Sequence, residues 1–239
     1  MVCDYWFVVL SDKLQHFYQP GKKLIMNCLL VAATPFEIAP FLEQYRPENN
    51  LPGDIDVLIT GIGLTITTYA LTKQLNIKRP DIIIQAGIAG CFDRSIALGT
   101  VVAVKQEAIA DQAVVEQGKW QTLFNLKLVA ENKYPFSKGW LVNKSDILKK
   151  IKLKKVTGIS VNEITTAKHK IKFYQKHFAP VAESMEGAAL HYVCLMEKIP
   201  FLQIRSISNY AAERNKKKWN MKKAIINLNN ELLSLLYKL

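Results

Sequence analysis

The segment that decides the fold is A-E-S-M-E-G-A-A-L-H-Y-V-C-L-M-E-K-I-P-F-L-Q-I-R-S-I-S-N, residues 182–209. Its apolar pattern predicts a strand over 180–185, a helix that begins at Gly187 and a second strand over 201–207. Glu186 follows the first strand, and Ser208 with Asn209 follows the second. Ligands of α/β proteins bind outside the carboxyl ends of strands. We therefore expect both strand ends to share one crevice for a small polyhydroxylated or heterocyclic ligand.

The same residues also have a purely structural interpretation. A carboxylate is favoured at a helix N-terminus, so Glu186 can simply cap the helix that Gly187 begins. Asn209 belongs to a residue type that commonly starts turns. Spacing alone favours these structural roles over a binding site.

The chain before this segment alternates strands and helices. Thr34 and Pro35 mark the start of one helix, because Thr is a good N-cap and Pro suits the first helical position. Strand–helix–strand order implies right-handed crossovers and parallel pairing. Buried strands are predicted over 28–33, 56–60 and 81–85, the last running into A-G-I-A-G at 86–90, with a helix over 64–76.

The remaining pattern completes one domain. We predict a single-domain three-layer α/β/α fold with a mixed, twisted central sheet and helices on both of its faces. The irregular stretch 111–137 is expected to form insertions over the mouth of the site. Further strands are predicted over 98–106, 139–142 and 156–162, and helices over 168–177 and 219–239.

Composition excludes several classes of protein. The chain has 239 residues, of which 49% are hydrophobic and 22% charged, as is ordinary for a globular domain. No apolar run approaches the roughly 18 residues that span a membrane. The four cysteines and four histidines show no metal-ligand spacing, and free buried cysteines favour a reducing, cytoplasmic setting. We therefore expect no metal, no cofactor and no membrane association.

The net charge of +12 is concentrated in 144–155 and 214–223. A basic surface can attract nucleic acid. These lysines are not interleaved with stacking aromatic residues, and no nucleic-acid-binding motif is present. We interpret them as solvated surface charge and expect no nucleic-acid partner.

Residues 1–25 stand apart from this pattern. They are rich in aromatic residues but lack the basic start, apolar core and cleavage site of a secretory signal. The core pattern begins directly after Met26. We expect residues 1–25 to be an N-terminal extension that is not native, because translation starts at Met26. Residues 26–239 are expected to form the catalytic domain. The alternative is a short arm that packs on the surface.

Several strings in the chain resemble the nucleoside phosphorylase and nucleosidase superfamily. They are M-E-G-A-A at 185–189 and R-S-I-S-N at 205–209, joined by A-A-T-P-F-E at 32–37, S-V-N-E-I-T-T at 160–166 and S-N-Y-A-A-E-R-N-K-K-K-W at 208–219. Together they are similar to the futalosine hydrolase family, from about Met26 to the end. The resemblance implies hydrolysis of futalosine to hypoxanthine and dehypoxanthine futalosine in menaquinone biosynthesis.

Two features favour water over phosphate as the nucleophile. Phosphorylases of this superfamily carry an arginine on the strand before the A-G-I-A-G stretch, where this chain has Gln85, and the 28–37 segment has no arginine either. Water needs a general base, and the resemblance assigns that role to Glu37. Thr34 and Glu37 also have the spacing of a capping box, so Glu37 has a structural interpretation as well.

Asn209 is expected to read the base. Relatives that act on adenine nucleosides carry Asp at this position. An Asn offers an NH₂ donor to a 6-oxo group and a carbonyl acceptor to a protonated ring nitrogen. The resemblance therefore implies a 6-oxopurine such as hypoxanthine, with Glu37 and Asn209 as the catalytic pair.

The resemblance also distributes the remaining site roles. Glu186 is implied to hold the ribose hydroxyls and Met185 its face, while Gly61 and Gly63 face the water on the anomeric side. The benzoate-bearing extension of futalosine needs a cation and an aromatic face, which Arg214 and Trp219 offer, although a solvated basic turn is the alternative for this segment. The remaining substrate-binding residues implied are Ile88, Ala89, Gly90 and Ile164.

Other functions stay open. Another purine nucleosidase or phosphorylase, of the methylthioadenosine/S-adenosylhomocysteine or purine nucleoside phosphorylase type, is the nearest alternative. A non-catalytic nucleoside-binding protein is a further one, although a binder needs no base beside the water. We expect a homodimer or higher homo-oligomer.

Overall fold

The computed structural model describes residues 26–44 and 54–238. The expectation for residues 1–25 lies outside the described residues. Nine strands of the described part form one mixed sheet, and a separate hairpin makes a second. The strands of the main sheet are β1 (Asn27–Ala32), β2 (Asp54–Ile59), β3 (Ile82–Cys91), β4 (Val101–Ile109), β7 (Phe136–Ser137), β8 (Trp140–Val142), β9 (Lys154–Ser160), β10 (Ala182–Ser184) and β11 (Phe201–Tyr210).

Parallel pairing dominates one end of the sheet. β1 pairs with β2 and with β3 in parallel, and β11 runs parallel to β3 along almost its whole length. These strands read as continuous apolar runs because they are covered on both faces. Antiparallel partners appear where β11 meets β4 and where β4 meets β8.

Five of the strands close on themselves. β3 pairs with β11, β11 with β4, β4 with β9, β9 with β10, and β10 returns to β3. The closure uses only the ends of β10 and β3, where Ala182 and Glu183 pair with Cys91 and Gly90. The result is a small distorted barrel beside the open strands β1 and β2.

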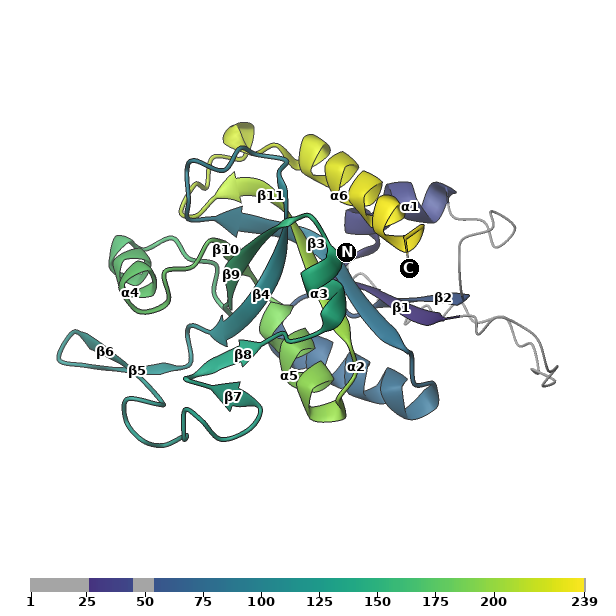
Figure 1. Cartoon of the computed structure of the whole chain (residues 1–239). Coiled ribbons are helices and arrows are strands. Elements are labelled where there is room, and N and C mark those ends of the chain that lie inside the picture. The colour runs from purple at the N-terminus through teal and green to yellow at the C-terminus, as the bar shows by residue number, and fades with distance from the viewer. Residues whose placement is uncertain (1–25, 45–53, 239) are drawn as a thin grey trace, which may run out of the picture.

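Helices cover the sheet on opposite faces (Figure 1). On one face lie α1 (Ala39–Gln44) and α6 (Met221–Leu236), and on the other α2 (Leu64–Ile77) and α5 (Gly187–Glu197). Each face has its own apolar core, with Leu228 and Leu232 of α6 in one and Leu71 of α2 in the other. This arrangement confirms the predicted mixed α/β fold class.

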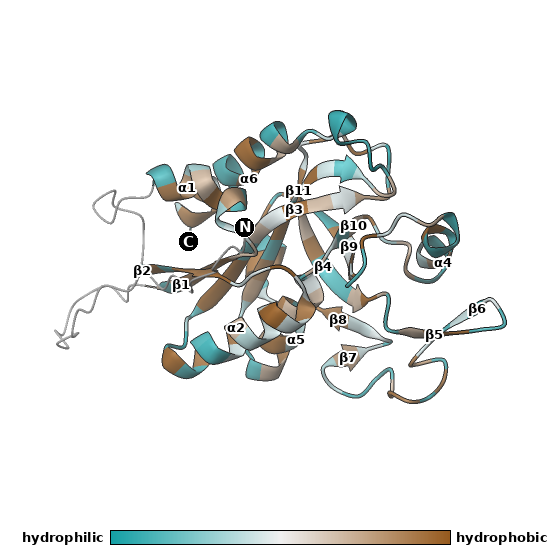
Figure 2. Ribbon diagram, turned by 180° about the vertical axis from the view of Figure 1, so that it is seen from behind, coloured by the Kyte–Doolittle hydropathy of each residue, from teal (hydrophilic) through white to brown (hydrophobic). Residues whose placement is uncertain are grey.

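The remaining helices are η1 (Pro35–Ile38), α3 (Asp146–Lys150), α4 (Lys168–Phe178) and η2 (Lys216–Lys218). Ile38 of η1 and Leu148 of α3 belong to the same apolar core as Leu228 of α6. The lysine-rich α4 is almost entirely hydrophilic in Figure 2, whereas β1 and the strands around it are apolar. Of the two basic stretches, 144–155 covers α3 and the start of β9, and 214–223 covers η2 and the start of α6.

Three sequence predictions need correction. β3 does not end at Gln85 but continues through A-G-I-A-G to Cys91, because β11 pairs with this stretch as far as Tyr210. β11 likewise contains Ser208 and Asn209 rather than ending before them. The predicted helix over 219–239 begins only at Met221.

The stretch 111–137 differs from its prediction as well. It holds the hairpin β5 (Ala113–Glu116) and β6 (Lys119–Thr122), which projects from the β8 side of the molecule (Figure 1). Trp120 packs against Phe173 of α4, with ring centroids 5.2 Å apart. Aromatic contacts therefore hold the hairpin to α4, and no residue of 111–137 lines the cavity described below.

No helix among the described residues is long and apolar enough to cross a membrane. Cys28, Cys91 and Cys194 are buried free thiols, as their apolar surroundings predicted. Within residues 26–44 and 54–238, no group of three or more His, Cys, Asp and Glu residues is placed to hold a metal ion.

Candidate active site

A cavity of about 300 Å³ lies where the first strands, the β10–α5 corner and the end of β11 meet. Ligand pockets commonly fall in this range of size. It collects most of the residues that the sequence singled out for the site. The lining comprises Ala33, Thr34, Phe36, Glu37, Ile62, Ile88, Ala89, Gly90, Val161, Ile164, Thr165, Glu183, Ser184, Met185, Glu186, Ser208, Asn209, Ala211, Ala212, Glu213, Arg214, Trp219 and Met221.

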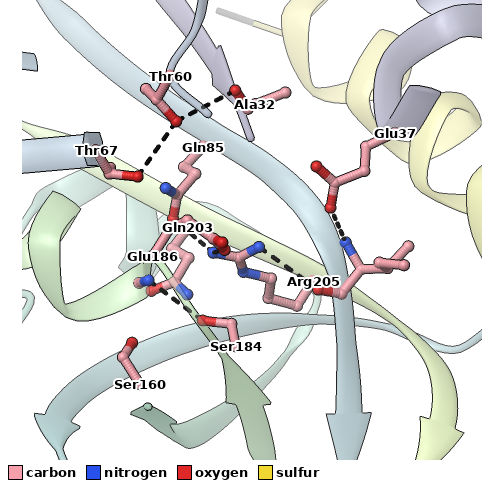
Figure 3. A network of polar contacts seen from close by, with 12 residues as sticks. Ala32, Glu37, Thr60, Thr67, Gln85, Ser160, Ser184, Glu186, Gln203 and Arg205 are labelled. Carbon is pink, nitrogen blue, oxygen red and sulfur yellow. Dashed lines mark hydrogen bonds and ion pairs between the residues drawn. The ribbon is translucent and has the colours of Figure 1, made fainter. Parts of the chain in front are cut away.

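Glu37 enters the cavity from η1 and is held by three donors. Its Oε2 accepts hydrogen bonds from the Thr34 amide at 3.1 Å and the Thr34 hydroxyl at 3.3 Å, and its Oε1 accepts from the Ile88 amide at 3.0 Å (Figure 3). The capping contact and the cavity position therefore coexist. A carboxylate offers about four lone-pair sites, so one remains for a further donor. Burial raises the pKa of Glu37, and the nearby Arg205 charge opposes that rise.

The η1 turn is fixed from the opposite end of the chain. Asn229 of α6 is buried, and its Nδ2 donates to the Glu37 carbonyl at 2.9 Å. Its Oδ1 accepts from the Phe41 amide at 3.0 Å. One asparagine therefore satisfies two buried backbone groups on either side of the η1–α1 junction, and it sets the position of Glu37.

Arg205 is a functional candidate that the sequence analysis missed. Its guanidinium is 1% exposed and lies beneath the cavity, where Nη2 donates to Gln85 Oε1 at 2.9 Å. Nη2 also lies 3.6 Å from Glu186 Oε2, and Nη1 lies 3.5 Å from the Ile88 carbonyl oxygen. A Cβ on Gly87 would collide with this guanidinium. Gln85 thus anchors an arginine that comes from the neighbouring strand.

Glu186 stands at the corner between β10 and α5. It is buried, and its Oε1 accepts from the Gly63 amide at 3.2 Å, while its Oε2 faces Arg205. Gly63 has a φ of 107°, which favours glycine, and this conformation places its amide toward Glu186. Gly61 and Gly63 do not line the cavity themselves, whereas Ile62 between them does.

Two serines cap the helix that follows Glu186. Ser184 Oγ accepts from the Gly187 amide at 3.2 Å, and Ser160 Oγ accepts from the Ala188 amide at 2.8 Å. They satisfy two of the amides that a helix N-terminus leaves unpaired, so the corner that presents Glu186 is rigid. The predicted cap role of the Glu186 side chain is not observed, since its side chain makes no cap hydrogen bond.

A buried carboxylate supports this corner from behind. Glu107 Oε1 accepts from Gln203 Nε2 at 2.9 Å, and Oε2 accepts from Ser160 Oγ at 3.2 Å. Burial raises the pKa of Glu107 to about 7, against the lowering by Gln203 and Arg205. Any side chain at Gly187 would collide with Glu107. The glycine of M-E-G-A-A is therefore required by packing against this pair.

Asn209 reaches the cavity through a β-bulge. In the pairing of β11 with β3, Ile207 faces Ala89 and Asn209 faces Gly90, so Ser208 is the extra residue. A bulge re-aims the side chains that follow it. Asn209 Oδ1 accepts from the Ser208 hydroxyl at 2.8 Å, and Nδ2 donates to the Tyr210 carbonyl at 3.1 Å. One amide hydrogen of Asn209 remains for a ligand.

The rim of the cavity is apolar on one side and basic on the other. Ile164 is 45% exposed and lines the cavity where the resemblance placed an aliphatic contact. Arg214 lies over the Trp219 ring, 5.6 Å from its centroid, and Trp219 Nε1 donates to the Glu213 carbonyl at 2.8 Å. The guanidinium of Arg214 and the ring of Trp219 therefore already contact each other at the rim of the cavity.

The histidines lie outside the cavity lining. His191 is fully buried in α5, with Nδ1 2.9 Å from the Leu141 carbonyl oxygen. Burial lowers its pKa to about 4, so it packs as a neutral ring. His169 and His177 contact Trp120 and Phe173, while His16 lies outside the described residues. The described histidines therefore pack against neighbouring aromatic side chains.

The family model described as the Phosphorylase superfamily matches residues 29–236. Among curated relatives, a 5′-methylthioadenosine/S-adenosylhomocysteine nucleosidase of Buchnera aphidicola is 28% identical over 163 residues, 65% of this chain and 66% of that enzyme. A futalosine hydrolase of Thermus thermophilus is 27% identical over 206 residues, 82% of this chain and 89% of that enzyme.

Solved structures agree on the fold. The native structure of futalosine hydrolase of Helicobacter pylori has a TM-score of 0.72 at 19% identity, covering 90% of this chain and 99% of that one. The structure of a 5′-methylthioadenosine/S-adenosylhomocysteine nucleosidase of the same organism, with butyl-thio-DADMe-Immucillin-A, has a TM-score of 0.73 at 19% identity, covering 91% and 100%.

Proposed function

Because the chain belongs to the phosphorylase superfamily, we propose that it is a nucleosidase that hydrolyses futalosine to hypoxanthine and dehypoxanthine futalosine, for menaquinone biosynthesis. The observation that carries the proposal is the convergence of Glu37, Glu186 and Asn209 on one cavity. Three polar groups, from η1, from the β10–α5 corner and from β11, match the water, the sugar and the base of a nucleoside.

In this reaction the bond between the anomeric carbon and the purine nitrogen breaks, and water adds to the sugar. An oxocarbenium-like sugar forms in the transition state, and a base must take the proton of the attacking water. Glu37 is that base, because its fourth lone-pair site is free to accept the proton of the water. The leaving purine takes up a proton from solvent on its ring, Asn209 Oδ1 accepts a hydrogen bond from that N–H, and Glu37 later returns the proton of the attacking water to solvent.

The surroundings of Glu37 favour water over phosphate. A phosphate dianion needs cations that it can touch. Arg205 is near, but it is 1% exposed, held by Gln85 and Glu186, and absent from the cavity lining. The carboxylates of Glu37 and Glu186 would also repel a dianion beside the sugar. Arg205 instead balances the two carboxylates from below.

The far rim of the cavity fits the extension of futalosine. Arg214 can bind its benzoate carboxylate with two hydrogen bonds, and Trp219 offers a face for the ring. Both residues line the cavity and already contact each other. A substrate without the acidic extension, such as methylthioadenosine, would leave this pair without a partner.

An adenine nucleosidase of the methylthioadenosine/S-adenosylhomocysteine type is the second candidate. Relatives with that activity are as similar in sequence as the futalosine hydrolase, so similarity alone does not choose between them. Asn209 favours the 6-oxopurine, since its NH₂ group matches an oxygen acceptor rather than an amino group.

The exposed apolar side chains beside the cavity support a homo-oligomer. Phe36 and Ile62 line the cavity yet are 60% and 52% exposed, and Tyr69 of α2 is 60% exposed. We propose a homodimer or higher homo-oligomer that covers these side chains. Light scattering of the purified protein measures the state directly.

The decisive experiment incubates the purified protein with futalosine, inosine and methylthioadenosine, with and without phosphate, and identifies the released base. We expect hypoxanthine from futalosine at a rate that phosphate does not change. Phosphate-dependent cleavage would overturn the hydrolase assignment. Adenine release from methylthioadenosine alone would favour the second candidate.

A further inference from the structure

Glu183 of β10 has no role in the mechanism above, yet it lines the same cavity. It is 8% exposed, and its Oε1 accepts from the Thr165 amide at 3.1 Å. Its Oε2 is buried and meets no hydrogen-bond partner within 3.5 Å among the described residues. Buried polar atoms are nearly always paired, so an unpaired carboxylate oxygen at a cavity wall indicates a ligand group that completes it.

The strand register places Glu183 opposite Asn209. Gly90 of β3 pairs with Glu183 on one side and with Asn209 on the other, so the three residues lie in one row across the sheet. Glu183 and Asn209 are two strand spacings apart, roughly 10 Å between Cα atoms. A Cβ on Gly90 would meet only Asn209 Nδ2, at 3.5 Å, so the space over the glycine is open. A flat ring can lie there with one edge toward both side chains.

A 6-oxopurine presents a matching row of groups on its edge. The ring nitrogen N7 comes first, the 6-oxo acceptor second and the N1–H donor third. Asn209 serves the first two positions in the proposed function, which leaves the N1–H donor without a protein partner. Resting on that function, we propose that Glu183 accepts the N1–H of the base and, with Asn209, selects 6-oxopurines over 6-aminopurines.

The chemistry of the two base types makes this contact selective. A 6-aminopurine has no hydrogen on N1, so its ring nitrogen would set a lone pair against the carboxylate. Glu183 Oε2 is itself buried, but the last torsion of a glutamate is broad, and the carboxyl group can turn an oxygen toward the ring at little cost. A site built to receive a donor rejects an analogue that lacks it far more strongly than an apolar pocket does.

The Thr165 amide makes Glu183→Gln an informative variant. It requires an acceptor, so it holds the Gln oxygen on its own side and leaves the NH₂ group toward the cavity. That NH₂ donates to N1 of a 6-aminopurine and opposes the N1–H of a 6-oxopurine. The variant therefore keeps the hydrogen bond with the Thr165 amide, whereas its contact with N1 becomes favourable for a 6-aminopurine and unfavourable for a 6-oxopurine.

The test measures kcat/KM for futalosine and for its 6-amino analogue, aminofutalosine, in wild type and in Glu183→Gln. The ratio is expected to move at least about tenfold toward the 6-amino substrate, the effect of one unpaired buried group. Glu163→Gln is the matched control. Glu163 lies two residues from Thr165, is exposed, forms an ion pair with Lys170 and does not line the cavity. Its ratio should equal that of wild type.

Binding of the free bases gives a readout that needs no turnover. By calorimetry, wild type should bind hypoxanthine at least about tenfold more tightly than adenine. An unmoved ratio in a folded Glu183→Gln variant, or wild-type preference for adenine, would overturn the proposal. If that variant does not fold, Glu183→Asp, which withdraws the carboxylate from the ring, is measured in its place, and an unmoved ratio there overturns the proposal. If wild type leaves futalosine intact but the variant still loses the preference of wild type for hypoxanthine over adenine, the proposed function fails and the base contact stands.

Discussion

Glu37→Gln separates the two roles that the structure gives Glu37. The carboxylate accepts from the amides of Ile88 and Thr34 at once, one on each oxygen. A Gln side chain keeps one acceptor and turns an NH₂ group toward the other amide. The variant therefore loses half of the helix cap and all of the basicity, while the side chain keeps its size.

The two losses differ in magnitude. One unsatisfied amide costs about 1–3 kcal/mol of folding free energy. Loss of a general base costs about 10²-fold or more in rate, which is about 3 kcal/mol or more of activation free energy. Binding of nucleoside should persist, because Glu186 and Asn209 are unchanged.

The assay is single-turnover release of hypoxanthine, with urea unfolding and ligand binding measured on the same samples. Thr34→Val is the matched control, since it removes the hydroxyl that donates to Glu37 and leaves the carboxylate in place. In wild type, kcat/KM should fall as the pH drops through the raised pKa of Glu37. The residual kcat/KM of Glu37→Gln should not show this fall at low pH. Near-normal turnover in Glu37→Gln would refute the base and leave Glu37 as a helix cap.

Three further predictions concern the support of the site. Burial raises the pKa of Glu107 from its ordinary 4.5 to about 7, so the folded state binds a proton that the unfolded chain releases, and wild-type stability falls as pH rises through this window. In urea unfolding, the unfolding free energy of Glu107→Gln should fall by about 3 kcal/mol less than that of wild type between pH 4.5 and 7. The same pH dependence in both proteins would show that Glu107 is not the group responsible. Asn229→Ala removes the side-chain hydrogen bonds to the Glu37 carbonyl and the Phe41 amide and should lower the unfolding free energy by about 1–3 kcal/mol; no measurable loss would mean that other groups replace the side chain. Arg214→Ala should raise KM for futalosine about tenfold or more and leave KM for inosine unchanged, whereas equal effects on both substrates would place Arg214 outside the extension subsite.

The sequence predicted those features that depend on local pattern. Apolar runs located the strands and helices, and the polar residues after them drew attention to Glu186 and Asn209, whereas the role of Glu37 came from the family resemblance. Those residues do line one cavity, because strands that run parallel bring their carboxyl ends to the same edge. Asn209 reached the cavity by a route that the pattern did not show, since the bulge at Ser208 is a property of the pairing with β3.

The missed residues are those whose partners lie far along the chain. Arg205 contacts Gln85 across 120 positions, and Asn229 contacts Glu37 across 192. Arg205 sits in an apolar run that reads as an ordinary buried strand, and Asn229 in an amphipathic helix. One signal was present: a charged residue inside a buried strand needs a partner, so Arg205 and Glu107 pointed to a buried polar network.

The place of β11 has a consequence for the order in which the protein assembles during synthesis. β11 lies between β3 and β4, which the ribosome completes about a hundred residues earlier. Until residue 210 has emerged, β3 and β4 each expose an unpaired backbone edge, and such edges recruit other strands. The nascent chain therefore grows by about a hundred residues with these two edges open. Premature termination between β10 and β11 should yield aggregating chains rather than a smaller folded protein, because the missing strand is the one that covers the edges of both β3 and β4.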